Sequence, residues 1–205
     1  MHKNLVLPLL VLYMICFSIS AKPLQDIIYT HRLNTIKKSY FLNDNLHCVS
    51  WERNLKTPLT VLLFIYPDCP LSVHYTYELQ QLQKKFNTDV NWLLIIPNDL
   101  YTYTEIMEFK HKNNYQLTIL FDFNKLLTNF YNIKIAPTAI LLDTAFQVKY
   151  YGKIDDYAIS LSKHKTKPTQ FYLQDAIIAL LKNKRNNTLP ITFTPKTIPI
   201  GCIIE

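Results

Sequence analysis

An almost uninterrupted apolar run, Leu59 to Tyr66, ends abruptly at Pro67-Asp68-Cys69-Pro70, and this junction constrains the fold more than any other part of the sequence. Such a run is typical of a β-strand that is buried on both faces. Beyond the break, apolar residues recur at helical spacing, which predicts one helix over Leu71–Phe86. The junction therefore predicts a central strand, a turn and a helix, with a cysteine in the turn.

The rest of the chain alternates strand-like and helix-like segments, after a lead-in over residues 22–38 and a hairpin over Ser39–Trp51. This order predicts an α/β fold in which a mixed central sheet carries helices on both faces. The further strands are expected at Val90–Ile96, Leu117–Phe121, Thr138–Leu142 and Val148–Tyr151, and the further helices at Tyr103–Lys112, Lys125–Tyr131 and Gln170–Lys184.

The first 21 residues have the pattern of a signal peptide. Lys3 supplies the positive charge, an apolar run of 13 residues follows from Leu5 to Phe17, and small residues lead up to Ala21. The run is short for a membrane span, which needs about 20 apolar residues, although an uncleaved anchor is the alternative. We therefore expect a signal peptide at 1–21, a domain at 22–184 with its lead-in, and an extended C-terminal arm at 185–205, in an exported protein that is periplasmic or secreted and has no membrane span after cleavage.

Composition excludes several classes of function. The chain has only 2 glycines, whereas phosphate-binding loops need several at fixed spacing. The net charge is +7, but the lysines are scattered and arginine is rare, so we expect solvated helix faces and no nucleic-acid partner. No organic cofactor is implied.

Cys69 is the strongest candidate for chemistry. Pro70 suits the first position of a helix, which makes Cys69 the cap residue, next to free backbone N–H groups that favour a thiolate. Signal cleavage would leave two further cysteines, Cys48 and Cys202, in a compartment where disulfides persist. Cys48 lies in an expected strand, and we interpret it as a buried bystander. Pro137 cannot donate to a sheet, so it must begin the strand that follows it.

Three motifs in order carry a resemblance to a known family. They are Pro67-Asp68-Cys69-Pro70-Leu71-Ser72-Val73-His74-Tyr75, then Gly152-Lys153-Ile154-Asp155-Asp156, and finally Gly201-Cys202-Ile203-Ile204. Together with Pro137, they make residues 40 to 204 resemble the thioredoxin-like redoxin family, which includes thiol-disulfide oxidoreductases and peroxiredoxins, and in particular an exported subgroup that carries these motifs.

The resemblance implies a thioredoxin-like three-layer sandwich that performs thiol-disulfide exchange on protein thiols or disulfides. Cys69 would be the attacking thiolate, and a cis Pro137 would lie against it and expose the preceding backbone to the partner. Ser72 stands where thioredoxins have their second cysteine, so Cys202 becomes the candidate resolving thiol. The residues expected to line this site are Asp68, Pro70, Ser72, Ala136 and Thr138.

Other interpretations of the same residues stay open. A thiol peroxidase, with peroxide as a further partner, is one, although Leu62 and Tyr66 replace the family's peroxide-binding residues and the only downstream arginine is Arg185. A copper-binding or copper-delivery module using Cys69, His74 and Cys202 is another, against a plain surface role for His74. A Cys69–Cys202 disulfide could also be a permanent staple of a binding domain. Asp155-Asp156 is expected to form a structural turn, and Asn186-Asn187-Thr188 is a glycosylation sequon.

Overall fold

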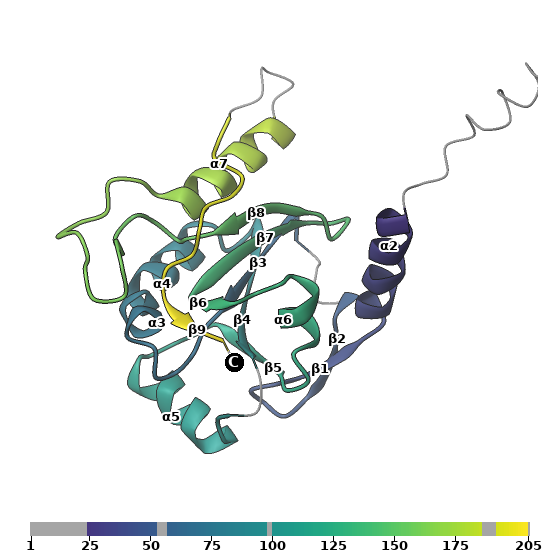
Figure 1. Ribbon diagram of the computed structural model, residues 1–205, viewed down its shortest axis with the longest axis horizontal. Coiled ribbons are helices and arrows are strands. Elements are labelled where there is room, and N and C mark those ends of the chain that lie inside the picture. Colours follow the sequence, from purple (N-terminus) through teal and green to yellow (C-terminus); the bar gives the residue numbers. More distant parts are fainter. Residues whose placement is uncertain (1–23, 53–56, 98–99, 186–191, 205) are drawn as a thin grey trace, which may run out of the picture. The chain divides into compact units, whose positions relative to one another are not determined.

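The computed structural model describes residues 24–52, 57–97, 100–185 and 192–204 (Figure 1). The expected signal peptide and the sequon lie outside these residues. Contacts divide the chain after Thr35, and the description from β1 onward concerns the second unit. The helices are α2 (Leu24–Lys37), α3 (Pro70–His74), α4 (Thr76–Lys85), α5 (Tyr103–Lys112), α6 (Leu126–Phe130) and α7 (Tyr172–Arg185). The strands are β1 (Tyr40–Asn43), β2 (Cys48–Ser50), β3 (Leu59–Phe64), β4 (Val90–Pro97), β5 (Thr118–Asp122), β6 (Ile135–Ala136), β7 (Thr138–Asp143), β8 (Val148–Gly152) and β9 (Cys202–Ile203).

Seven of these strands form one mixed sheet in the order β2-β1-β5-β4-β3-β7-β8. Strand β3 lies inside it, parallel to β4 and antiparallel to β7. Strands β1 and β2 form the expected hairpin at one edge. The mixed sheet and the position of β3 are as predicted, because only a strand with neighbours on both sides can use so many consecutive apolar residues.

The core lies on both sides of β3, where side chains alternate between the two faces of the sheet. Val61 and Leu63 belong to a large buried cluster that includes residues of α4, α5 and α7. Leu62 and Phe64 are equally inaccessible to solvent and point to the opposite face, on which Figure 1 places α6. The layers of helix, sheet and helix therefore fix the carboxyl end of β3, where the turn with Cys69 begins.

The helix expected over Leu71–Phe86 is interrupted at Tyr75, which separates α3 from α4. Two side-chain hydroxyl groups donate hydrogen bonds to carbonyl groups in the last turn of α3. The Tyr115 hydroxyl donates to Ser72 O at 3.2 Å, and the Thr76 hydroxyl donates to Val73 O at 2.6 Å. Such side-chain bonds compete with the regular helical ladder, which accounts for the break.

Two more differences concern the ends of the chain. Within the expected lead-in, for which no helix was predicted, Leu24–Lys37 form α2. The arm, expected to be extended, forms the short strand β9, which pairs antiparallel with β6 in a separate two-stranded sheet. Among the described residues, no helix combines the length and apolar character needed to cross a membrane.

Candidate active site

Cys69 lies in the turn that follows β3. Its backbone N–H donates to Tyr66 O at 3.1 Å, and its extended conformation, with φ −77° and ψ 118°, makes it the N-cap of α3. Pro70 occupies the start of this helix, as the sequence predicts. The cysteine side chain is completely buried. The local sequence thus holds the sulfur at the end of the central strand.

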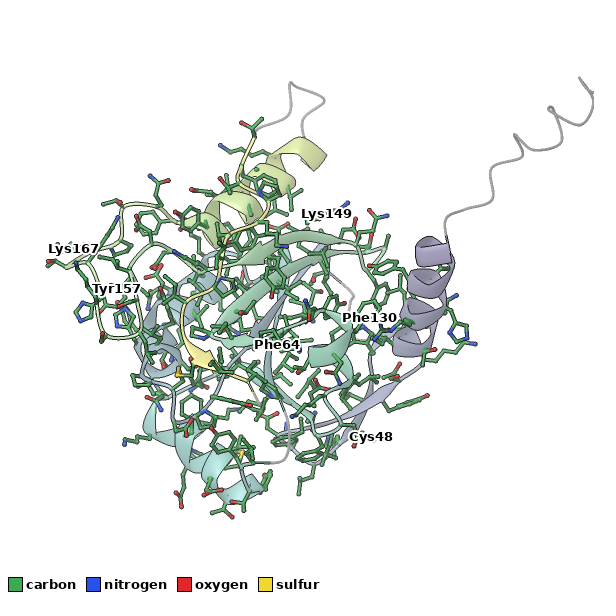
Figure 2. All side chains as sticks on the ribbon, viewed as in Figure 1. Cys48, Phe64, Phe130, Lys149, Tyr157 and Lys167 are labelled. Carbon is green, nitrogen blue, oxygen red and sulfur yellow. A yellow bond between two sulfur atoms is a disulfide. The ribbon has the colours of Figure 1, made fainter. Side chains whose placement is uncertain are left out.

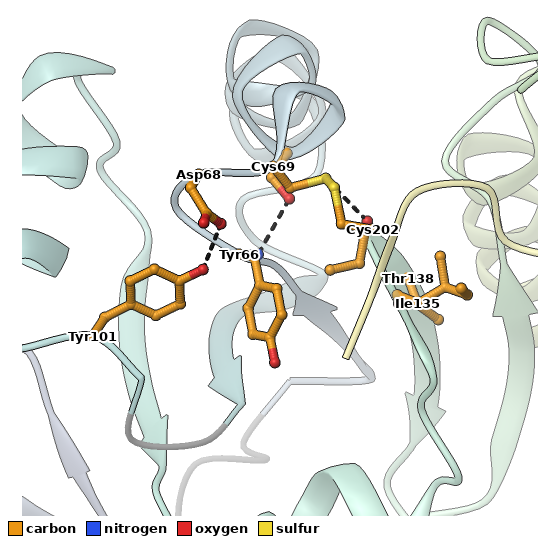
Figure 3. Close-up of a disulfide and its surroundings, with 9 residues drawn as sticks. Tyr66, Asp68, Cys69, Tyr101, Ile135, Thr138 and Cys202 are labelled. Carbon is orange, nitrogen blue, oxygen red and sulfur yellow. Dashed lines mark hydrogen bonds between the residues drawn. A yellow bond between two sulfur atoms is a disulfide. The ribbon is translucent and has the colours of Figure 1, made fainter. Parts of the chain in front are cut away.

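Cys69 forms a disulfide with Cys202, 133 residues away in the sequence (Figure 3). The two Cα atoms are 6.0 Å apart. Cys202 belongs to β9, which the arm brings to this end of the sheet (Figure 1). The two cysteines that the sequence offers for chemistry therefore occupy one site.

Pro137 stands directly after β6 and before β7, and its peptide bond to Ala136 is cis. The Ala136 carbonyl oxygen lies 3.3 Å from the Cys69 sulfur. In β6, Ala136 is paired with Cys202. The Thr138 hydroxyl donates to Ile135 O at 2.6 Å and so ties together the two sides of the proline. These residues bring a backbone edge against the disulfide.

Ser72, at the place of a second thioredoxin cysteine, is completely buried and supports the turn. Its hydroxyl oxygen accepts the backbone N–H of Tyr66 at 3.2 Å. Its carbonyl accepts the hydroxyl of Tyr115, whose pKa burial raises to about 12. The serine therefore holds the two ends of the turn together with a group that cannot form a disulfide.

Asp68 is exposed and accepts a hydrogen bond from the Tyr101 hydroxyl. Burial, followed by this hydrogen bond, raises the pKa of Tyr101. Figure 3 shows the Asp68 carboxylate directed toward Tyr101 and away from Cys202. The carboxylate is thus held beside the turn by a neutral donor.

The alternative metal site is not assembled. Both sulfurs are engaged in the disulfide, and the ring of His74 stacks on Tyr157 with 3.7 Å between centroids. Burial lowers the pKa of His74, against the opposing effect of the Asp155 carboxylate. Within the described ranges, no three His, Cys, Asp or Glu side chains are placed to hold a metal ion.

Asp155 and Asp156 hold neighbouring segments in place. The Tyr75 hydroxyl donates to Asp155 at 2.6 Å, which links the second motif to the end of the first. Burial raises the pKa of Asp155, although hydrogen bonds from Tyr75 and Tyr157 oppose it. Asp156 accepts the backbone N–H of Thr169 at 2.7 Å, just before α7. Both carboxylates have hydrogen-bonding roles that agree with the structural turn expected here.

The prediction that Cys48 is buried is wrong. Its side chain is exposed and its thiol is free. Cys48 begins β2, the edge strand of the sheet (Figure 2), where a side chain can face solvent. It is therefore an accessible thiol that experiments on the other two cysteines must take into account.

Sequence analysis did not single out Thr197 and Tyr150. The Thr197 hydroxyl oxygen accepts the backbone N–H of Lys153 at 2.8 Å and lies 2.9 Å from the Tyr150 hydroxyl. Nothing about an isolated threonine in a proline-containing arm indicates such a contact. Glycine is scarce in this chain, so Gly152 could have marked a place where another segment comes very close. The segment that comes close to it is the one with Thr197.

No protein-family profile matches the sequence, and no curated protein matches it. Solved structures do match the fold. An uncharacterized conserved protein from Geobacillus kaustophilus superimposes with a TM-score of 0.69 at 22% identity, over 82% of this chain and 87% of that one. A thioredoxin-like protein from Aeropyrum pernix gives 0.53 at 13% identity, over 78% and 98%. This chain has a thioredoxin-like fold.

A third similar structure is a secreted disulfide oxidoreductase of Mycobacterium tuberculosis, described as homologous to Escherichia coli DsbE. It superimposes with a TM-score of 0.51 at 18% identity, over 73% of this chain and 98% of that one. At these identities the likeness establishes the fold, while the activity has to be argued from the site. The expected thioredoxin-like α/β architecture is confirmed.

Proposed function

We propose that this chain is an exported thioredoxin-like protein that performs thiol-disulfide exchange through Cys69, with Cys202 as the resolving thiol. One observation carries the proposal. Two cysteines 133 residues apart are joined at the end of the central strand, with the backbone before Pro137 against them. A disulfide at this place of a thioredoxin-like fold supports the proposal, because it is what the oxidised half of an exchange cycle requires.

The chemistry needs only protein sulfurs. A reduced Cys69 attacks one sulfur of a partner disulfide, forms a mixed disulfide and releases the partner's other sulfur as a thiolate. Cys202 then attacks Cys69, which restores the internal disulfide and releases the partner as a dithiol. Pro137 frames the partner, Ser72 keeps the turn closed, and no cofactor takes part. The partners are protein thiols or disulfides in an oxidising compartment, to which the signal sequence directs the chain.

Trapping tests the proposal. In a Cys48→Ser background, which removes the exposed thiol, Cys202→Ser should leave a stable mixed disulfide on Cys69 after reaction with a disulfide substrate, because no nearby thiol clears it. Peptide mapping by mass spectrometry gives the position of the adduct. The matched control is Cys69→Ser, which should accumulate far less adduct on Cys202.

Three other outcomes would contradict the proposal. A structural staple would resist mild reductant in the wild-type protein, and no adduct would form on Cys69. A copper module would show protection of both thiols from alkylation only when copper is added. A peroxidase differs in the substrate that it needs, since hydrogen peroxide and not a disulfide would convert Cys69 to a sulfenic acid in the Cys202→Ser variant.

A further inference from the structure

Within the described part of the arm, residues 192–204, two points are docked by hydrogen bonds to the domain. The first is at Thr197. Its hydroxyl oxygen accepts the N–H of Lys153 at 2.8 Å, and its own N–H donates to Tyr151 O at 2.9 Å. The Tyr151 N–H in turn donates to Pro195 O at 3.1 Å. None of these bonds involves the disulfide.

The second point is the strand β9. Cys202 pairs with Ala136, Ile203 pairs with Ile135, and the N–H of Ile204 donates to the carbonyl of Lys134 at 2.9 Å. This is the backbone edge that precedes Pro137 and faces Cys69. The arm therefore covers the edge at which the proposed exchange would receive a partner.

Both glycines of the chain stand at these two points. A Cβ on Gly152, whose φ is +143°, would lie 2.5 Å from the carbonyl oxygen of Thr197. A Cβ on Gly201 would lie 2.6 Å from the carbonyl carbon of Ala136. Both distances are far inside van der Waals contact with backbone, so each docking point requires the absence of a side chain. A chain that uses glycine only twice places both where the arm meets the domain.

The two points differ in what holds them. The first depends on a partly buried hydroxyl network that includes Tyr150, a residue that is itself completely inaccessible to solvent. The second is a two-residue pairing, extended by the Ile204 N–H bond and by the buried Ile204 side chain and fastened by the disulfide. Between the two points, Ile198 is 82% exposed. The hydrogen bonds at Thr197 do not depend on residues 198–204, the arm tip, so the tip can leave β6 while Thr197 stays in place.

We propose that the arm tip is a tethered occupant of the partner-binding edge. It leaves Ile135–Ala136 when the disulfide opens, and it is replaced by an extended partner segment with glycine directly before its cysteine. This rests on the proposed function. The requirement for glycine follows from the register. A partner cysteine that takes the place of Cys202 in the bond to Cys69 puts its preceding residue against the Ala136 carbonyl, where Gly201 lies now.

The occupant of the edge changes with the redox state of the disulfide. A dithiol reductant supplies two electrons and two protons, becomes a disulfide itself, and opens the Cys69–Cys202 bond into two thiols. The tip vacates the edge, and the partner disulfide enters and is attacked by Cys69. Thr197 keeps Cys202 near, because the five residues that follow Thr197 reach at most about 17 Å. Cys202 then attacks Cys69, and the tip returns as the reduced partner leaves.

Peptides test the glycine requirement. The protein is the reduced full-length mature chain with Cys48→Ser, Cys202→Ser and Gly201→Ala, in which the added methyl group expels the tip. The probe is an acetylated peptide with the sequence of residues 198–204, whose cysteine is disulfide-bonded to thionitrobenzoate, and its match has alanine in place of glycine. The reference is N-acetylcysteine bonded to the same group. Absorbance follows the release of thionitrobenzoate.

We expect the glycine peptide to react about tenfold faster than the alanine peptide, since one methyl group too many is strongly disfavoured against backbone. The protein that keeps Gly201 should react with the glycine peptide at a similar rate, because its tip has already left the edge in the absence of the disulfide. Equal rates for the two peptides, or a several-fold gain from Gly201→Ala, would overturn the inference alone. If the N-acetylcysteine reference also failed to react, the proposed function would be overturned and the inference with it.

A second measurement tests whether Thr197 holds the arm to the domain. Thr197→Val, in the Cys48→Ser background, removes the hydroxyl that Lys153 and Tyr150 contact. The internal disulfide should then compete less well with glutathione, and its effective concentration should fall several-fold, because a longer tether dilutes Cys202. Thr194→Val makes the same chemical change at an exposed position of the same arm and should leave the value unchanged. An unchanged value for Thr197→Val would overturn the role of Thr197.

Discussion

The two cysteines of the disulfide are positioned by different sheets. Cys69 follows β3 of the seven-stranded sheet, and Cys202 lies in β9 of the two-stranded β6–β9 sheet. Different forces hold the two cysteines in place. In the larger sheet, Leu62 and Leu63 of β3 are completely buried between strands and helices. In the smaller one, Ile203 is 72% exposed and only two residue pairs are formed. Burial fixes Cys69, whereas backbone hydrogen bonds, one hydroxyl network, the disulfide and a single buried side chain, that of Ile204, fix Cys202. Opening the disulfide should therefore change one side of the site and leave the other intact.

The largest effect is expected where burial dominates. Leu62→Ala in β3 should lower the free energy of unfolding by about 2–5 kcal/mol, because it leaves a cavity between Leu93 and Ile140 of the neighbouring strands. Urea unfolding measures the loss, and the same value should be found with and without reductant. Ile203→Ala, at the exposed end of β9, is the control and should cost far less. A similar cost for both variants would remove the distinction between the two sheets.

A smaller effect is expected in the segment after β8, which polar contacts hold as they hold the arm. Burial alone would raise the pKa of Asp156, but hydrogen bonds from Lys165, Thr169 and Gln170 outweigh it and hold that pKa below its ordinary value. Asp156→Asn should therefore cost about 1–3 kcal/mol at neutral pH. The cost should shrink as the pH falls below about 3.9, since the stability gained from a depressed pKa is lost as the folded state takes up the proton.

Asp155→Asn is the matched comparison, for which the change of stability with pH should have the opposite sign. The pKa of Asp155 is raised by burial, so the folded state binds this proton more tightly than the unfolded state does. The wild-type protein should then gain stability relative to Asp155→Asn as the pH falls, and lose it as the pH rises through the folded pKa. Urea unfolding of both variants at several pH values measures the two trends. Parallel trends would contradict the assignment of these two carboxylates.

The sequence predicts the larger sheet better than the smaller one for a physical reason. Burial leaves a pattern, and the run from Leu59 identified β3 and the turn at Cys69. Helix α5 matches its predicted bounds because Thr102 and Glu105 form a capping box at its start. The pairing of Ile135–Ala136 with Cys202–Ile203 leaves no pattern, since strands of two residues have no period to detect. That the second thiol comes from the arm followed only from the family resemblance.

Errors of the sequence analysis have equally local causes. The break at Tyr75 depends on the Tyr115 hydroxyl, which comes from a distant segment and is invisible to helical spacing. Helix α2 mixes polar and apolar residues without a continuous apolar face, so its periodicity gave no signal. Cys48 was expected to be buried because it lies in a strand, but β2 is an edge strand with one side open to solvent. Tertiary contacts decided each of these cases.

The smallest effect should separate an exchangeable disulfide from a permanent one. In the Cys48→Ser background, Cys202→Ser should match the reduced protein in its free energy of unfolding to within about 0.5 kcal/mol, because the serine removes only a sulfur that reduction had already released. Thr197 stays docked in both proteins, so the rest of the arm contributes equally. Thermal and urea unfolding under reducing conditions give the comparison. A deficit of about 2 kcal/mol or more would mean that the Cys202 side chain stabilises the reduced fold, and that the arm tip does not leave β6 when the disulfide opens.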